Sequence, residues 1–413
     1  MKEFLKKAIF YEKLPASIQE KIAFIGNKLF TTKRTARCNF AVANISLQDI
    51  ELAVYFDGGL GLLYQIEQWF NQLEILDENK KILIVTRILP TYNWLLKNTK
   101  FIIVHCRTMD DLIGFYDENN LKTILYVNHS QSNFQSLING KALHVHINHG
   151  ESDKTSTITH QSQAYDYVFI SAQAAYDKYN LNLIKKDMNK FIKVGRPQVD
   201  NVQQIEPFDT NKKVILYAPT WEGTHESMNF SSLIEYGLSM VEQIVNSNEY
   251  FLVYKPHPNS GSRNKKLFNI NEEIQNILND SSNSEVILDG DINSLYPHID
   301  IAIFDNSAVA IDYLIVDKPM IMTDLFYKIE GRLDKPTITG ATKMITADDS
   351  KDILNIIKNE LINDTVKIKR DEISKYFLGE YDYSKCESTE LFIKKVLEVS
   401  DERDVLIKEL DKL

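Results

Sequence analysis

Short apolar runs rich in β-branched residues alternate with amphipathic stretches from about residue 51 onward. This alternation is typical of parallel strands joined by helices. Between the first two runs, residues 61–76 carry apolar side chains at helical spacing, which predicts a helix with one buried face. The first half of the chain is therefore predicted to form a doubly wound α/β domain. Its predicted strands are ELAVYF (51–56), KILIVTR (81–87), FIIVHC (101–106), KTILYVN (122–128), ALHVHIN (142–148), YVFIS (167–171) and FIKVG (191–195).

A polar stretch with two prolines, residues 195–213, separates these runs from a second set. We predict an N-terminal α/β domain over residues 1–200 and a C-terminal α/β domain over residues 201–385. Two such domains in tandem enclose a cleft, and each sheet is expected to present the carboxyl ends of its strands there. The second set of predicted strands is KVILYAP (213–219), YFLVYKP (250–256), EVILD (285–289), DIAIF (300–304) and PMIMT (319–323).

The last segment, residues 386–413, has the charged amphipathic pattern of a helix. We predict that this helix packs back against the N-terminal domain. The alternative is a tail that binds a partner protein.

Composition narrows the class of protein. The 413 residues, 44% hydrophobic and 25% charged, are more chain than one hydrophobic core normally organises, which favours two domains. A net charge of -10 argues against a protein that coats nucleic acid. The 3 cysteines lie far apart, so neither a disulfide framework nor a cysteine zinc site is predicted, and reduced cytoplasm is the expected compartment. No uncharged run of about 18 residues occurs, so neither a membrane span nor a secretion signal is predicted.

Three histidines fall together in HVHINHG (144–150). His144 and His146 alternate onto one face of the predicted strand, where buried, hydrogen-bonded rings are a more common outcome than metal ligands. No carboxylate-rich segment completes a ligand set, so no metal is predicted. His149 differs, because it lies at the exit of the strand before Gly150, which lets a ligand approach the backbone closely. A base or an oxyanion partner is plausible at His149.

Two strand-exit loops of the second half contain residues that suit phosphate chemistry. YAPTWEG (217–223) carries Thr220, and VYKPHP (253–258) carries Lys255 before the first of two prolines and His257 between them. An ordinary turn is the alternative. Lys and His are, however, poor choices for a simple turn and good choices for contacting phosphate and transferring a proton.

A third exit, FDNSAVAIDYLIVDKP (304–319), places Asp305, Asn306 and Ser307 before an apolar helix. Ser307 near the helix N-cap leaves free backbone N–H groups facing the cleft, which predicts a phosphate site. Capping alone also explains these residue types.

In the first half, DGGLG (57–61) lacks the spacing of a dinucleotide fingerprint, so Gly58 and Gly59 indicate either a close-approach loop for an acceptor or a plain tight turn.

Taken in order, these loops resemble the motifs of the CDP-glycerol glycerophosphotransferase family, the bacterial polymerases and primases of teichoic acids and related phosphopolyol capsules. The resemblance covers roughly residues 140–397. The segments that carry it are HINHG, GRPQVD, YAPTWEG, KPHP, DINSLYPHIDIAIFDNSAVAIDYLIVDKPMI (291–321) and FLGEYDYSKCESTELFIKKVL (377–397).

The resemblance implies a glycosyltransferase-B-like fold with the nucleotide in the second domain and the acceptor in the first. It implies transfer of glycerol phosphate, or another polyol phosphate, from a CDP donor to a hydroxyl of a lipid-linked or capsular glycan, with release of CMP and without a metal or cofactor. His149 and His257 match the family's catalytic histidines. The expected donor-binding residues are Thr220, Lys255, Asp305, Asn306 and Ser307, and the expected acceptor-binding residues are Gly58, Gly59 and Gly150.

Four positions depart from the family's usual residues. Glu222 stands where arginine is usual, Ala308 where a second serine is usual, Asn306 where tyrosine is usual, and Gln198 where arginine is usual. These departures leave the polyol, and the class of donor, open. A nucleotide-sugar glycosyltransferase of capsule or lipopolysaccharide synthesis with the same architecture is the alternative enzyme. A non-catalytic subunit of carbohydrate assembly is the alternative from another class.

Membrane contact is expected mainly from the family. Residues 2–14 and 27–37 mix lysine and arginine with apolar side chains, which suits attraction to the anionic cytoplasmic face of the cell membrane. A solvated domain edge explains both segments equally well. The acceptor, the number of units added and the oligomeric state are left open.

Overall fold

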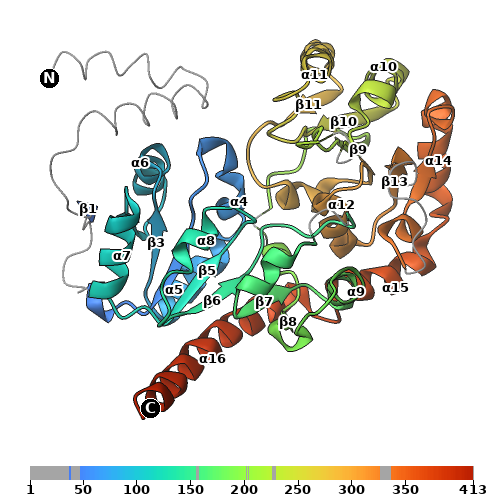
Figure 1. Ribbon diagram of the computed structural model, residues 1–413. Helices are drawn as coiled ribbons and strands as arrows, with labels where there is room; N and C mark the ends of the chain where they lie inside the picture. The colour runs from blue at the N-terminus through green and yellow to red at the C-terminus, as the bar shows by residue number, and fades with distance from the viewer. Residues whose placement is uncertain are drawn as a thin grey trace, which may run out of the picture.

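The computed structural model describes residues 37–38, 47–154, 158–200, 202, 204–225, 229–325 and 336–412. Within these residues the chain forms two mainly parallel sheets, each with helices on both faces (Figure 1). The two segments for which membrane contact is expected, residues 2–14 and 27–37, lie outside the described residues apart from Arg37. No helix of the described residues is long and apolar enough to cross a membrane.

The first sheet has the strand order β1-β4-β3-β2-β5-β6-β7-β8, and all of its pairings are parallel except that of β1 with β4. The order reverses at β2, so loops that leave neighbouring strands on either side of that point open a crevice suited to a ligand. The strands are β1 (Arg37–Cys38), β2 (Leu52–Tyr55), β3 (Ile82–Thr86), β4 (Ile102–His105), β5 (Thr123–Tyr126), β6 (Leu143–His146), β7 (Tyr167–Ile170) and β8 (Phe191–Lys193).

The second sheet has the order β11-β10-β9-β12-β13-β14 and is parallel throughout. Each predicted strand of both halves overlaps an observed one, while β1 and β14 were not predicted. The fold class is therefore confirmed, and the exact domain limits stay a prediction. The strands are β9 (Lys213–Ala218), β10 (Tyr250–Tyr254), β11 (Ser284–Val286), β12 (Ile301–Phe304), β13 (Met320–Thr323) and β14 (Lys343–Ile345).

Helices cover both faces of each sheet, which explains why the strands read as continuous apolar runs rather than alternating ones. Every side chain of β3 is 0% exposed. The longer helices are α5 (Phe70–Asn79), α6 (Leu89–Asn98), α7 (Met109–Glu118) and α9 (Gln173–Asn182) on the first sheet, and α10 (Leu238–Ser247), α11 (Lys265–Asn279), α14 (Ile353–Asn363) and α15 (Lys367–Leu378) on the second.

The predicted helix over residues 61–76 is broken. It consists of the turn η2 (Leu60–Leu62), the short helix α4 (Tyr64–Glu67) and then α5. The break falls at Trp69, whose indole N–H donates a 2.6 Å hydrogen bond to the carbonyl of Asn148 beyond the end of β6. This tie between two loops fixes α4 beside the exit of β6.

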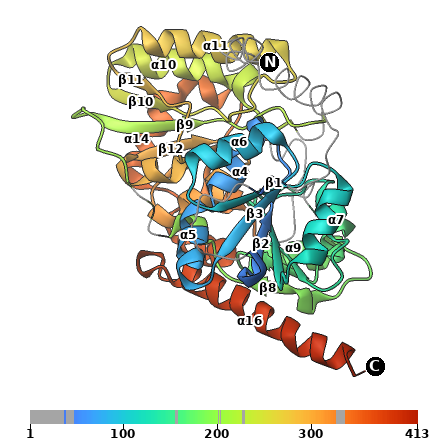
Figure 2. The same cartoon turned by 90° about the vertical axis from the view of Figure 1, so that its left-hand side faces the viewer.

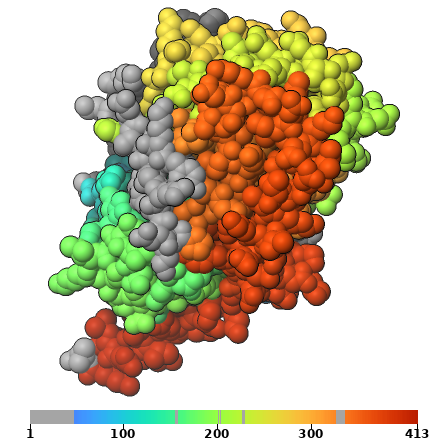
Figure 3. All heavy atoms as spheres, turned by 90° about the vertical axis from the view of Figure 1, so that its right-hand side faces the viewer, coloured from blue at the N-terminus to red at the C-terminus, as the bar shows by residue number. Residues whose placement is uncertain are grey.

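The last helix, α16 (Glu387–Leu410), packs on the first domain as predicted. Phe392 and Val396 join the core cluster that contains Trp69, and the rings of Trp69 and Phe392 lie 4.9 Å apart. Figure 2 shows α16 running beneath the first sheet and projecting beyond it. From the opposite side, Figure 3 shows the red atoms of α16 along the base of the molecule, below the second domain.

Several contacts join the two domains directly. The backbone N–H of Ile338 donates to Asp153 at 3.0 Å, and the Tyr376 hydroxyl donates to Asp177 at 2.9 Å. These bonds hold loops of the first domain against the second domain.

Candidate active site

The two predicted catalytic histidines come together beside one tyrosine. His149 follows β6 in the first domain and His257 follows β10 in the second. The ring of Tyr64, the first residue of α4, lies 6.0 Å from the His149 ring and 5.5 Å from the His257 ring between centroids, edge-on to both. The site is thus built from both domains, as the sequence predicted for the histidines but not for Tyr64.

The turn that carries His149 is tightly constrained. Asn148 has a φ of 54°, in the left-handed region that asparagine tolerates better than most residues. Its side chain donates to the carbonyl of Gly150 at 2.8 Å and accepts from the backbone N–H of His149 at 2.9 Å. Because the carbonyl of Asn148 also accepts from Trp69, the backbone on both sides of the imidazole is fixed.

The His149 imidazole is partly buried and neutral at ordinary pH. Burial lowers its pKa to about 3, and the neighbouring His129 and Arg196 lower it further. The carbonyl of Val127 accepts a hydrogen bond from the ring, so one ring nitrogen is protonated and the other keeps its lone pair. Nδ1 has no close hydrogen-bond partner among the described residues. A neutral imidazole with a lone pair can accept a proton from a substrate.

The ring of His257 is fixed with its proton on Nε2. The backbone N–H of Asn259 donates to its Nδ1 at 3.1 Å, so a neutral ring carries its proton on Nε2. Burial lowers the pKa of His257 to about 3, with a further contribution from the charge of Lys154. Trp221 stacks on the ring at 5.8 Å and 15°. His257 therefore presents a fixed N–H donor rather than a second base.

Glu222 anchors the His257 loop. Its carboxylate accepts backbone N–H groups from Gly261 at 3.0 Å, Arg263 at 2.7 Å and Asn264 at 3.1 Å, at the start of α11. The side chain is 6% exposed, so these donors replace water around it. An arginine at this position cannot accept these bonds. The acidic residue is thus explained by the local backbone, with no need for a substrate contact.

Asp305 connects the loop after β12 to the loop after β9. Its carboxylate is 0% exposed and accepts from the backbone N–H groups of Thr220 at 2.9 Å and Ser232 at 3.1 Å, and from the Thr323 hydroxyl at 2.9 Å. Asp305 therefore sets the position of Thr220. Direct contact of either residue with a donor stays a prediction.

The neighbouring Asn306 is 1% exposed, and neither its Oδ1 nor its Nδ2 has a hydrogen-bond partner among the described residues. Buried amides are nearly always paired, so this one is suited to a polar ligand.

Ser307 is the N-cap of the five-residue helix α12 (Ala308–Asp312), and its hydroxyl donates to the Asp305 carbonyl at 3.2 Å. Lys255 donates to the Asp289 carbonyl at 2.8 Å, and burial lowers its pKa.

Two of the three predicted glycines, Gly58 and Gly150, lie at close contacts. A Cβ on Gly58 would come 2.5 Å from the Phe56 ring, and a Cβ on Gly150 would come 3.0 Å from the Cβ of Ala308. Gly59 has an ordinary φ of -71° at the start of η2. The contact between Gly150 and Ala308 joins the domains, which gives a steric reason for a small residue at position 308. Acceptor binding by the three glycines stays a prediction.

Sequence reasoning missed three residues around the histidines. Arg196 is 4% exposed and donates to the carbonyl of His149 at 3.1 Å. Lys154, in the loop after His149, lies with its Nζ 4.5 Å from the ring centroid of Phe230 in the second domain. Arg196 belongs to the GRPQVD segment, so the motif was a signal from which it could have been found. Neither Tyr64 nor Lys154 has a motif, since their roles depend on how the domains meet.

The remaining histidines of the HVHINHG segment are structural, as predicted. His144 is hydrogen-bonded to the Tyr126 hydroxyl at 2.7 Å, and His146 donates to the Asn128 carbonyl at 3.2 Å. Among the residues that the structure describes, no group of three His, Cys, Asp or Glu side chains is arranged to hold a metal ion.

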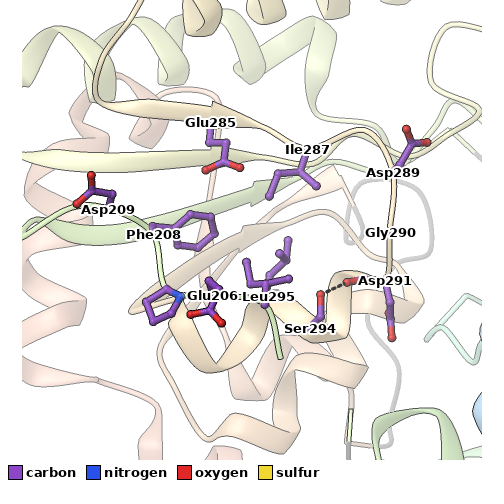
Figure 4. Close-up of a pocket in the computed structure, with 12 residues that line it drawn as sticks. Glu206, Phe208, Asp209, Glu285, Ile287, Asp289, Gly290, Asp291, Ser294 and Leu295 are labelled. Atoms are coloured by element: carbon purple, nitrogen blue, oxygen red, sulfur yellow. Dashed lines mark hydrogen bonds between the residues drawn. The ribbon is translucent and has the colours of Figure 1, made fainter. Parts of the chain in front are cut away.

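A separate pocket of about 460 Å³ lies at the edge of the second sheet, between β11 and the linker at residues 205–209 (Figure 4). Its lining includes the carboxylates of Glu206, Asp209, Glu285, Asp289 and Asp291. Such a concentration of negative charge disfavours a diphosphate, so this pocket is a poor candidate for the donor's phosphates.

Several solved structures have a fold similar to that of this chain. A variant of the wall teichoic acid polymerase TagF has a TM-score of 0.58 at 12% identity, covering 86% of this chain and 90% of that chain. A TagF variant soaked with CDPG has a TM-score of 0.54 at 13% identity, with 87% and 91% covered. UDP-GlcNAc 2-epimerase from Neisseria meningitidis, bound to UDP-GlcNAc, has a TM-score of 0.53 at 13% identity, with 84% and 100% covered. At these identities the likeness shows the fold.

No curated protein matches the sequence. The family model for CDP-glycerol:poly(glycerophosphate) glycerophosphotransferase matches residues 65–330, which span both domains and contain both site histidines. The chain therefore belongs to the CDP-glycerol:poly(glycerophosphate) glycerophosphotransferase family and is an enzyme of that type.

Proposed function

We propose that the enzyme transfers glycerol phosphate, or a related polyol phosphate, from a CDP-linked donor to a hydroxyl of a lipid-linked or other cell-surface glycan, and releases CMP. Membership of the family supports this activity, and the likeness of the fold to the wall teichoic acid polymerase TagF supports a role in teichoic acid synthesis. The observation that carries the proposal is the pair of neutral histidines beside Tyr64. One has a lone pair to accept a proton, and the other has a fixed N–H to donate.

The proposed reaction uses His149 as the base. An acceptor hydroxyl is too weak an acid to ionise near neutral pH, so His149 takes its proton as the oxygen attacks the β-phosphorus of the donor. The new oxygen–phosphorus bond forms while the bond from the β-phosphorus to the bridging oxygen breaks, and CMP leaves with that electron pair. His149 then passes the proton to solvent as CMP departs, which returns the imidazole to its neutral form.

His257 then has the second role. Its Nε2–H is placed to donate to the phosphoryl group, where negative charge is spread over the oxygens in the transition state. Lys154 supplies positive charge near His257. Lys255, which leaves the same strand, adds a second cation on this proposal, and the unpaired amide of Asn306 offers a further donor. On this proposal the donor's charge is met by side chains, without a metal or cofactor.

The test is release of CMP by the purified protein from CDP-glycerol and CDP-ribitol, with a lipid-linked glycan as acceptor. We expect His149→Gln and His257→Asn each to lower turnover by roughly a hundredfold or more. His144→Gln is the matched control, because His144 is structural. No CMP from any CDP-polyol would overturn the proposal, and full activity in both variants would overturn the roles.

The main sequence argument for a nucleotide-sugar donor was the acidic residue at position 222. Because Glu222 caps the His257 loop, that argument no longer favours a different donor class. A thermal-shift comparison of CDP-, CMP- and UDP-linked compounds separates the two donor classes, since a ligand that binds the folded state raises the melting temperature. We expect CDP-linked compounds to give the larger shift.

A cytoplasmic location with peripheral contact to the membrane belongs to the same proposal, because a lipid-linked acceptor is presented at that surface. Sedimentation with anionic vesicles at low and high salt tests it. Binding that weakens with salt is the expected result, since the attraction of lysine-rich segments is electrostatic.

A further inference from the structure

We propose that Tyr64 is the wall of the reaction centre that limits the size of the transferred polyol phosphate, an inference that rests on the proposed function. Its ring is edge-on to both imidazoles, at 85° to His149 and 81° to His257. A group passing between a donor at His257 and an acceptor at His149 therefore has this aromatic ring beside it.

Tyr64 is held by its neighbours in and before α4. Its hydroxyl accepts from the Gln65 amide at 3.2 Å, and Gln65 in turn accepts from Asn128 at 3.0 Å. Asn128 follows β5 and is 3% exposed, and the chain neighbours Leu63 and Ile66 are core residues. The ring cannot move away without disturbing this hydrogen-bond chain or the core beneath α4. It is thus a rigid boundary.

The geometry of phosphoryl transfer makes this boundary selective. The attacking and leaving oxygens lie roughly in line on either side of the phosphorus, so the polyol attached to phosphorus points sideways from that line. Reacting atoms must approach to about 3–3.5 Å, which keeps the transferred group within the space around the two imidazoles. A longer polyol meets the Tyr64 ring. We infer that the site accepts a three-carbon glycerol phosphate more readily than a five-carbon ribitol phosphate.

The ring is also suited to a polyanionic neighbour. Burial raises the pKa of Tyr64, so its hydroxyl stays neutral and does not repel phosphate. Rejection of the longer substrate therefore arises from shape. We therefore expect the longer substrate to be accepted better when the ring is removed, but not when only the hydroxyl is removed.

The experiment compares kcat/KM for CDP-ribitol and CDP-glycerol in the wild type, Tyr64→Phe and Tyr64→Ala. We expect the ratio of ribitol to glycerol to rise roughly tenfold or more in Tyr64→Ala and to stay within about threefold in Tyr64→Phe. Tyr176→Ala is the matched control, since Tyr176 is a partly buried tyrosine of the same domain whose ring lies under Lys193. If Tyr64→Ala melts below the assay temperature, Tyr64→Leu replaces it with the same expectation.

The two proposals fail in different ways. A wild type that releases CMP from CDP-glycerol, with the same substrate ratio in Tyr64→Ala or Tyr64→Leu, overturns the role of Tyr64 alone. A similar rise of the ratio in Tyr64→Phe also overturns it, because the hydroxyl would then be responsible. A wild type that releases CMP from neither donor overturns the proposed function, and the inference with it.

Discussion

The guanidinium of Arg196 binds the carboxylate of Asp312 through two hydrogen bonds, of 2.7 and 3.0 Å, in a fully buried pair. Arg196 lies in the segment between the sheets, and Asp312 ends α12. The same guanidinium donates to the carbonyl of His149. The pair therefore connects the two domains to the backbone of the proposed base.

Breaking this pair is predicted to cost stability and activity together. Asp312→Ala leaves a buried guanidinium without its partner, which typically costs about 3–5 kcal/mol of unfolding free energy. Arg196→Lys keeps the charge but loses the bidentate geometry and the bond to His149, so CMP release should fall more than stability does. Urea unfolding and initial rates measure both. Lys351→Ala, which breaks an exposed pair with Asp348, is the control, and an equal effect there would contradict the prediction.

We predict that kcat/KM falls on acidification only at a pH well below the ordinary pKa of histidine. The neutral form of His149 is the active one, and its pKa is lowered from 6.5 to about 3. Protonation therefore removes the base only in strong acid, and kcat/KM for CDP-glycerol should be nearly flat between about pH 8 and 5. Initial rates across that range measure it. A loss of rate centred near pH 6.5 would show that the imidazole is not buried as described.

Glu222→Arg, which restores the residue usual in the resembled motif, is predicted to impair the enzyme. Three backbone N–H groups at the start of α11 lose their acceptor, with a cost of about 3 kcal/mol or more, and the His257 loop loses its anchor. Glu222→Gln keeps one acceptor oxygen and should lose about half as much. Melting temperature and CMP release measure the effect, with Glu249→Arg as an exposed control. Faster turnover in Glu222→Arg would instead assign position 222 to donor binding.

Asp200 is predicted to make stability depend on pH. Its Oδ2 accepts from the backbone N–H of Thr389 at 2.5 Å, while its buried Oδ1 has no partner among the described residues. Burial raises its pKa from 3.8 to about 6. The folded state thus favours the protonated acid, and stability contributed by this group is lost as the pH rises from about 4 through 6.

Asp200→Asn should consequently raise the melting temperature at pH 8 and change it little at pH 4.5. The amide keeps an oxygen for Thr389 and removes the buried charge. Asp401→Asn, on the exposed side of α16, provides the control. A loss of stability at pH 8 would mean that the charged form is the one the fold requires.

Chelation is predicted to leave the reaction unchanged. The proposed donor contacts use the charges of Lys154 and Lys255 and the amide of Asn306, so millimolar EDTA should not lower CMP release. Loss of activity that Mg²⁺ restores would contradict this prediction.

Lys154→Met should raise KM for the CDP donor more than it lowers kcat, if its charge mainly binds ground-state phosphate.

Strand positions were predictable because each buried parallel strand corresponds to a short apolar run in the sequence. The helix over residues 61–76 was wrong as a single element, because the hydrogen bond from Trp69 to Asn148 links segments far apart in the sequence. The three-residue strand β14 is too short for a periodic signal.

The site was predictable only where a motif marked it. The strand-exit motifs predicted His149 and His257 as site residues, but nothing local signals that Tyr64 meets both rings. Glu222 shows the same limit, because its partners at residues 261–264 lie some forty positions away and act through backbone groups, whose direction a sequence pattern does not report.

The position of α16 has a consequence for how the protein is made. Phe392 and Val396 complete the hydrophobic core of the first domain, although they follow the whole second domain in the sequence. That core cannot close on the ribosome until the whole second domain has been synthesised. A fragment ending at residue 200 should therefore expose the apolar surface beneath Trp69 and aggregate. An autonomous first domain requires α16 to be fused behind β8 through a short linker.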